Sequence, residues 1–239
     1  MRQALIRKGR INHIEPHKGA SRLRDFILGW QDGLVNVLGV ILGVAAATND
    51  TRVVIIAGLA ATFAESISMM AVAYTSFKAE ADFYRSEVQK ELKEMRDKPD
   101  VERQEMRAIF HRMGFAGNLL ESIVKRITSN RKRWLDTMME LELKMSPPKV
   151  SPLNVAIVVG LSAFIGSFIP LIPFVLLPVK AAVLVSIGIA VAVLFFVGVY
   201  KGMTTVGSPL RSGIEMAVIG ILAALAGYAV GAIAGAFIH

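Results

Sequence analysis

Five long apolar runs, separated by polar segments, dominate the hydrophobic pattern of this chain. The runs are Phe26–Thr48, Val53–Phe77, Leu153–Leu177, Ala181–Tyr200 and Ile214–Ile238. Because about 20 helical residues cross the hydrocarbon core of a bilayer, each run is long enough to span a membrane. The pattern therefore predicts five transmembrane helices. Pro170 and Pro173 interrupt the third run, which is tolerated where neighbouring helices satisfy the freed carbonyl groups.

The longest polar segment, residues 78–151, predicts a helical domain outside the bilayer. It is rich in charge and contains no apolar run of spanning length. One helix is expected over Lys78–Lys98, and a second is expected to begin at Pro99 with acidic residues in its first turn. Shorter helices are predicted over Asn118–Ile127 and Trp134–Met145.

The distribution of positive charge predicts the orientation of these spans. The chain carries 27 Lys and Arg against 19 Asp and Glu, a formal net charge of +8. If the amino terminus is inside, 25 of the 27 cations lie on inside segments and only Arg52 and Lys180 lie outside. Cytoplasmic loops carry such an excess of Lys and Arg. The amino terminus and the helical domain are therefore predicted to be cytoplasmic and the carboxyl terminus outside, and the charge requires no nucleic-acid partner.

The predicted fold class is all-α, a polytopic membrane protein with five transmembrane helices and a cytoplasmic helical domain inserted between spans two and three. Its expected parts are a basic cytoplasmic N-terminal segment (1–25), transmembrane helices 1 and 2 (26–77), a metal-binding helical domain (78–151) and transmembrane helices 3–5 (152–239). Composition agrees, since 54% of the 239 residues are hydrophobic and the mean hydropathy is +0.52. The absence of cysteine excludes disulfides, thiolate metal sites and cysteine nucleophiles.

Carboxylates inside the apolar runs are the first candidate functional groups. Asp32 lies within the first run, and Asp25 and Asn36 share its helical face to within roughly 40°. In the second run Glu65 and Met69 are one turn apart. A charged side chain at the centre of a span costs about 2.5–3.5 kcal/mol on insertion scales. Either these groups are structural and hydrogen-bonded, or they line a cation path, in which a thioether favours a softer ion such as Fe(II) over Mg or Ca.

Acidic clusters in the helical domain are the second candidate. The clusters are Glu80, Glu87, Glu91 and Glu94; Glu102 and Glu105; and Met138, Met139 and Glu142. Like charges one turn apart on a helix repel by a few tenths of a kcal/mol per pair. A solvated charged face is the plain interpretation, whereas bound cations would relieve the repulsion. Gly227, Gly231 and Gly235 form a small-residue ridge that predicts close helix packing.

Several stretches resemble the vacuolar iron transporter family. They are Asp25–Leu34 (DFILGWQDGL), Ile67–Met69, Lys78–Tyr84, Trp134–Glu142 and Ile169–Phe174, in order and at the family's spacing. The resemblance implies a homodimer of five-span subunits that moves Fe(II) out of the cytosol in exchange for protons. It also implies a cytoplasmic domain that collects the ions before transport.

The resemblance also implies which residues bind metal. In the cytoplasmic domain they are Glu91, Glu94, Glu102, Glu105, Met138, Met139 and Glu142, and in the membrane path they are Asp25, Asp32 and Met69. Two positions depart from the family, since Ser21 and Ala61 stand where glutamate is usual. Glu65 lies one turn beyond Ala61 on roughly the same face, and our hypothesis is that it substitutes. The departures bear on proton coupling and metal preference.

The predicted function is thus a proton-coupled secondary transporter, not an enzyme, with no resident cofactor. Fe(II) is the expected substrate, Mn(II) the second, and Co(II) and Zn(II) are further candidates; protons and the lipid bilayer are the other partners. The membrane would be the plasma membrane in a prokaryote and the vacuolar membrane in a eukaryote. The alternatives are a membrane-anchored oxidase and a metal sensor. A di-iron oxidase normally uses Glu-x-x-His pairs, and His111 is not placed for one.

Overall fold

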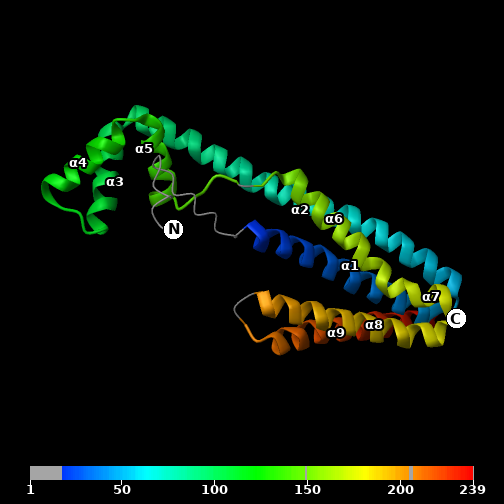
Figure 1. Cartoon of the computed structure of the whole chain (residues 1–239). Helices are drawn as coiled ribbons and strands as arrows, with labels where there is room; N and C mark the ends of the chain where they lie inside the picture. Colours follow the sequence, from blue (N-terminus) through cyan, green and yellow to red (C-terminus); the bar gives the residue numbers. More distant parts are fainter. Residues whose placement is uncertain (1–17, 149, 205–206, 239) are drawn as a thin grey trace, which may run out of the picture. The chain divides into compact units, whose positions relative to one another are not determined.

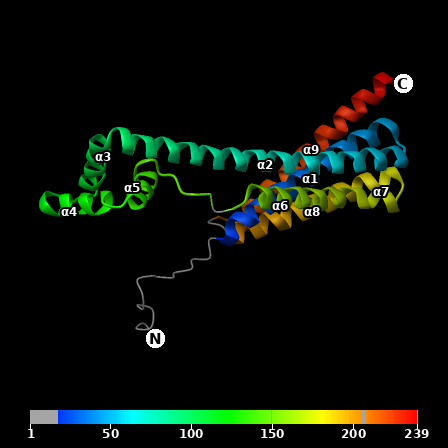
Figure 2. The same ribbon diagram turned by 90° about the horizontal axis from the view of Figure 1, so that it is seen from above.

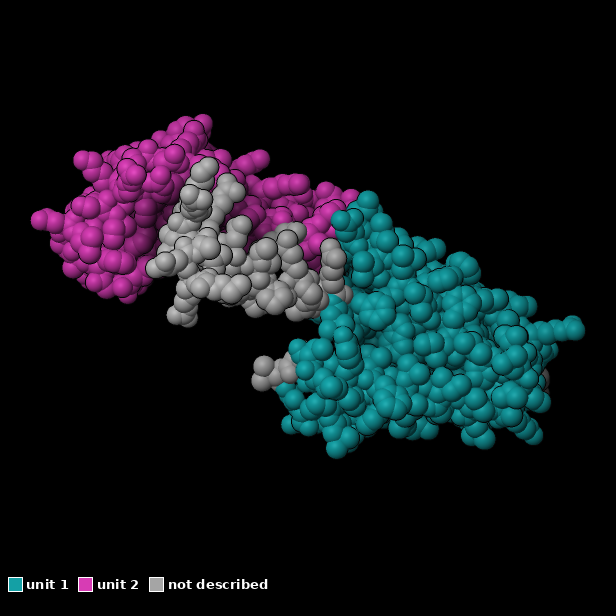
Figure 3. All heavy atoms as spheres, in the orientation of Figure 1, with its two compact units in different colours: residues 1–73, 153–239 teal, residues 74–152 magenta. Residues whose placement is uncertain are grey.

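The computed structural model describes residues 18–148, 150–204 and 207–238, and side chains from residue 23 to residue 237. Every regular element within these ranges is a helix, which confirms the predicted all-α class. The chain forms two compact units (Figure 3), unit 1 from residues 1–73 with 153–239 and unit 2 from residues 74–152. Most of the predicted basic N-terminal segment lies outside the described residues.

Unit 1 contains the apolar helices. They are α1 (Lys18–Thr48), the first part of α2 (Thr51–Asp97), α6 (Pro152–Phe168), α7 (Ile172–Leu176), α8 (Val179–Thr204) and α9 (Pro209–Ile238). Five helical stretches among the described residues are long and apolar enough to cross a membrane, with α6 and α7 together forming the third. Helices α8 and α9 lie side by side in both views (Figures 1 and 2).

The third span breaks where its prolines predict. Helix α6 ends at Phe168, the 3-10 turn η3 covers Ile169–Leu171, and α7 continues from Ile172. Proline has no N–H group for the helical ladder, so carbonyl groups near it need other donors. The Ser186 hydroxyl of α8 donates a hydrogen bond of 2.7 Å to the carbonyl oxygen of Pro170. A neighbouring helix therefore compensates for the break.

Glycines let helix α1 touch its neighbours backbone to backbone. A Cβ added to Gly231 of α9 would collide with the carbonyl oxygen of Gly43, and one added to Gly227 would collide with that of Gly39. At another point of α1, a Cβ on Gly33 would collide with the carbonyl of Ala163 in α6. The glycine ridge predicted in the last span is thus used for packing within the chain.

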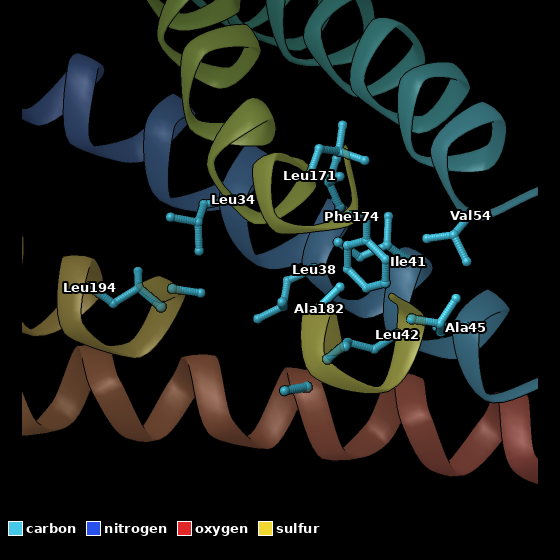
Figure 4. Close-up of a cluster of buried hydrophobic side chains, with 14 of the residues drawn as sticks. Leu34, Leu38, Ile41, Leu42, Ala45, Val54, Leu171, Phe174, Ala182 and Leu194 are labelled. Carbon is cyan, nitrogen blue, oxygen red and sulfur yellow. The ribbon is translucent and has the colours of Figure 1, made fainter. Parts of the chain in front are cut away.

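The apolar core of unit 1 is built around one face of α1 (Figure 4). Leu34, Leu38 and Ile41 are fully buried there, together with Phe174 of α7 and Leu194 of α8. At 100° per residue, Asp25, Asp32 and Asn36 lie on the side of α1 opposite these three core residues. The core therefore fixes α1 with its polar side chains turned away from the apolar cluster.

Unit 2 contains the charged helices. It consists of the second part of α2, then α3 (Pro99–Arg112), α4 (Gly117–Thr128), α5 (Arg131–Thr137) and the π-helix η2 (Met138–Glu142). A small core of Met95, Met106, Val124, Trp134 and Met138 holds these helices together. The unit is thus a packed helical domain, with a core of its own.

Three helix boundaries differ from the sequence-based expectation. The predicted second span and the predicted helix after it are one continuous helix, α2, because nothing between Phe77 and Lys78 breaks the helical ladder. The helix expected over Trp134–Met145 begins earlier, because the Asn130 side chain accepts a hydrogen bond from the Arg133 N–H at 3.0 Å and caps it. It also ends earlier, in a π-turn that closes at Glu142.

Candidate functional site

Two buried glutamates from different helices form the centre of the candidate site in unit 2. Glu91 lies on α2 and Glu102 on α3, after the turn that Pro99 initiates, and each is only 4% exposed. The two carboxyl groups lie within hydrogen-bonding reach of each other. Oε1 of Glu91 and Oε2 of Glu102 are buried with no hydrogen-bond partner in the described part of the chain. Buried polar atoms are normally satisfied, so these oxygens are available to a ligand.

Burial and mutual repulsion disturb the titration of this cluster. Desolvation, followed by the hydrogen bond and the charge of Glu102, raises the pKa of Glu91 to about 8, and Glu142 and Glu94 add to the effect. Burial also raises the pKa of Glu102, with contributions from Glu105 and Glu94. Desolvation and the same neighbours raise the pKa of Glu142. The structure thus brings all five predicted glutamates into one electrostatic group that favours a proton or a cation.

The two methionine ligands predicted in unit 2 lie in the π-helix η2. Met138 and Met139 are both buried, at 0% and 2% exposure, although they are adjacent in the chain. Met138 packs in the apolar core of unit 2 against residues that include Trp134. The Met138 side chain therefore has a packing role whether or not its thioether also binds metal.

The glutamates of unit 2, as the structure has them, do not form a complete metal-coordination site. Across residues 18–148, 150–204 and 207–238, no three Asp, Glu or His side chains stand in an arrangement that could hold an ion. Two members of the predicted first cluster lie apart from the rest: Glu80 is exposed, and Glu87 pairs with Lys90 at 3.6 Å. Binding an ion at Glu91 and Glu102 would therefore require side chains to move together.

A second polar group lies between two apolar helices of unit 1. The Glu65 side chain of α2 interacts with Asp32 and Asn36 of α1. Asp32, Glu65 and Met69 are half-buried, whereas Asn36 is exposed. The Thr62 hydroxyl, one turn before, is bonded to the Gly58 carbonyl of its own helix at 2.8 Å. All four predicted path residues thus lie on these two helices, and two of them, Asp32 and Glu65, interact directly.

Asp25, the predicted path residue before Asp32, lies nearer the start of α1. It is 5% exposed and pairs with the neighbouring Arg24, with 3.0 Å between the Arg24 Nη2 and Asp25 Oδ1 atoms. The side chain of Ser21 lies outside the described residues. Ala61 is half-buried and packs against the core of unit 1.

One contact in unit 2 was not predicted from the sequence. The Arg103 guanidinium of α3 lies 5.6 Å from the Trp134 ring centroid of α5. No spacing rule links two residues so far apart in the chain.

This chain is similar to a known protein family and to proteins named as iron transporters. The model of the VIT family matches residues 23–232. The chain belongs to the VIT family. A tulip (Tulipa gesneriana) protein named vacuolar iron transporter 1 is 33% identical over 220 residues, which cover 91% of this chain and 89% of the relative. The protein of the same name from Arabidopsis thaliana is 34% identical over 91% of this chain and 88% of its own length.

A fungal relative extends the similarity beyond plants. The vacuolar iron transporter cccA of Arthroderma benhamiae is 30% identical over 228 residues, which cover 90% of this chain and 80% of the relative. The VIT family match begins at Leu23 in α1 and ends in α9, so it takes in both units. It therefore contains the acidic cluster as well as the polar group between α1 and α2.

Proposed function

We propose that this VIT family member is a secondary active transporter that moves Fe(II), and Mn(II) as a second substrate, out of the cytosol in exchange for protons. The observation that carries the proposal is the pair of interacting carboxylates, Asp32 and Glu65, on two helices that are apolar enough to cross a membrane. Ionisable groups inside a span are costly and rare, and where they occur they commonly mark a path for ions or protons. The names of the relatives support iron as that cation.

In this proposal unit 2 is a cytoplasmic domain that collects the metal. The excess of Lys and Arg on its side of the membrane supports the cytoplasmic orientation. Glu91, Glu94, Glu102, Glu105 and Glu142 supply carboxylate oxygens, and Met138 and Met139 supply thioether sulfurs. Such a mixed set suits a first-row ion such as Fe(II) better than Mg or Ca, and leaves Co(II) and Zn(II) as further candidates. The unpartnered oxygens of Glu91 and Glu102 support these two as the first ligands.

From unit 2 the ion passes to Asp25 and then to a site formed by Asp32, Glu65 and Met69. Glu65 supplies the carboxylate that Ala61 lacks, since its side chain reaches Asp32 directly. Protons and metal ions compete for the same oxygens. Protons that enter from the far side would neutralise these carboxylates and release the ion there. The path thus exchanges protons for metal without any resident cofactor.

A homodimer is part of the proposal. Asn36 is exposed and Asp32 and Glu65 are half-buried in a single chain, although all three lie in apolar helices. Ionisable residues within spans normally face the interior of a bundle or a water-filled cavity. A second copy laid against this face of α1 and α2 would cover the polar group and complete a path between the two chains.

Reconstitution into liposomes tests the proposal. Purified protein in vesicles is given Fe(II), Mn(II), Co(II) or Zn(II) under an imposed pH gradient, with a metal-sensitive dye inside and oxygen monitored outside. We expect Fe(II) to cross, Mn(II) more slowly, and protons to move in the opposite direction. Oxygen consumption without metal flux would favour the oxidase. Metal binding with neither flux nor oxygen consumption would favour the sensor and contradict the proposal.

A further inference from the structure

A groove of about 600 Å³ opens on unit 1 between α1, α8 and α9. It lies at the end of the unit where α1 ends at Thr48 and α8 begins at Val179. Its walls are mostly aliphatic and include Leu184 of α8 and Leu225 of α9, both largely exposed, with the aromatic Tyr228 of α9 beside them. Its volume is within the range of about 300–1,000 Å³ that is usual for ligand sites. None of the proposed path residues lines it.

Polar side chains stand at one end of the groove. Lys180 of α8 and Asn49, just after α1, line it there. Lys180 is exposed, and no carboxylate in the described ranges pairs with it. The nearby Asp50 instead accepts hydrogen bonds from the N–H groups that begin α2, such as that of Arg52 at 2.7 Å. The ammonium group is therefore free to bind an anion at the rim.

The groove runs along the helices from this charged rim. The lining residues of α8 extend from Val179 to Ile187, which corresponds to about 12 Å of helix. A cation and an amide at the end of an apolar slot match a molecule with a phosphate at one end and a hydrocarbon chain below it. Basic pockets between membrane helices on the cytoplasmic side bind anionic lipid headgroups, and Lys180 offers the same chemistry at the end of unit 1 that is predicted to lie outside.

We propose that the groove holds one acyl chain of an anionic phospholipid, whose phosphate is bound by Lys180 and Asn49. The hydrocarbon chain covers the aliphatic walls that Leu184 and Leu225 expose. This inference requires only that unit 1 lies in a bilayer, and it is independent of which ion the protein transports. The bound lipid fills the space between α1, α8 and α9 and so ties the three helices together.

Lipid retention by matched variants tests the proposal. The full chain is purified in detergent and incubated with phosphatidylglycerol or phosphatidylcholine of identical acyl chains, and lipid retained per chain is counted by native mass spectrometry. Leu225→Trp narrows the groove, and Leu184→Trp narrows it from the other wall. The control is Leu222→Trp on the same helix, which is exposed to a similar extent, 60% against 62%, but does not line the groove.

We expect the unchanged chain and Leu222→Trp to retain about one phosphatidylglycerol, and both groove variants to lose it. Lys180→Gln should lower phosphatidylglycerol retention about fivefold, since one such cation near the headgroups contributes about 1 kcal/mol. It should lower phosphatidylcholine retention less, because the choline cation of that lipid offsets the charge of its phosphate. Arg52→Gln removes the other cation near this end of unit 1, and it should leave the retention of both lipids unchanged. Equal retention by Leu225→Trp and Leu222→Trp would overturn the proposal. So would a change in oligomeric state with Leu225→Trp, which would identify a second copy as the occupant.

Discussion

Glu91 and Glu102 bury their carboxyl groups beside each other, although one lies on α2 and the other on α3, eleven residues later in the chain. Each keeps one oxygen that has no hydrogen-bond partner among the described residues. Two carboxylates this close are both charged only when a cation lies between them, and otherwise one of them holds a proton. The pair is therefore a place where protonation and metal binding exclude each other.

The first prediction is that metal binding at this pair releases a proton. With a pKa of about 8, Glu91 is largely protonated at pH 7 and must lose its proton to bind an ion. Calorimetric titration with Mn(II) in buffers of different ionisation enthalpy should show close to one proton released per ion at pH 7. Glu91→Gln should abolish the release and weaken binding tenfold or more. Glu121→Gln, which removes a surface partner of Arg107, should alter neither. Unchanged proton release in Glu91→Gln would contradict this assignment.

The second prediction concerns stability without metal. The pKa of Glu91 is raised from 4.5 to about 8, so the folded unit 2 binds more protons than the unfolded chain between these values. Its stability is therefore greatest at the acidic end of this window and falls as the pH rises through about 8. Melting followed by Trp134 fluorescence, in a Trp30→Phe background, should shift to lower temperature from pH 5.5 to pH 8.5. Mn(II) should remove the shift. A melting temperature that rises with pH would show that the glutamates are stabilised in their charged form.

The third prediction tests the glycine contact between α1 and α9. Gly231→Ala places a methyl group against the Gly43 carbonyl, and the two backbones must separate. Overpacking of this kind typically costs about 1–3 kcal/mol. Gly188→Ala is the control, because nothing lies within 4 Å of its Cβ position. Thermal unfolding of the detergent-solubilised protein should show a clear loss for the first variant and none for the second. Equal melting temperatures would mean that α9 is not held against α1 at this point.

How far the sequence predicts the fold depends on which interactions decide each feature. The spans follow from local composition, and so does the break at Pro170 and Pro173. The π-turn at Met138 does not, because it arises where the end of a capped helix packs against the core of unit 2. A stretch of five residues such as Met138–Glu142 carries no sequence pattern that separates a π-helical turn from an α-helical one.

For the candidate site, helical spacing predicted which acidic residues share a face of one helix, but not how the faces of different helices meet. Helical spacing grouped Glu91 with Glu94 and Glu102 with Glu105, yet it could not show that Glu91 and Glu102 face each other across the α2–α3 turn. Spacing also grouped Glu87 with Glu91, whereas the structure pairs Glu87 with Lys90. Contacts between helices depend on how the helices pack, and one helix's periodicity does not contain that information.

The fourth prediction is that Glu65 couples transport to protons. Because Glu65 interacts with Asp32, replacing it by glutamine keeps the shape and removes the group that exchanges a proton. In liposomes Glu65→Gln should transport Fe(II) at a rate that no longer responds to the pH gradient. Glu215→Gln is the control, since Glu215 is exposed and paired with Arg211 at 3.0 Å. An unchanged response to the gradient in Glu65→Gln would assign proton coupling to another group.

Asp32→Ala gives the most direct test of the central claim, that carboxylates inside the spans carry Fe(II) through the membrane. Fe(II) flux into liposomes and metal binding by the same purified variant are measured side by side. The account predicts that flux falls to the level of protein-free vesicles while binding by unit 2 is unchanged, because the acidic cluster there does not include Asp32. Fe(II) flux at the wild-type rate in Asp32→Ala would contradict the account.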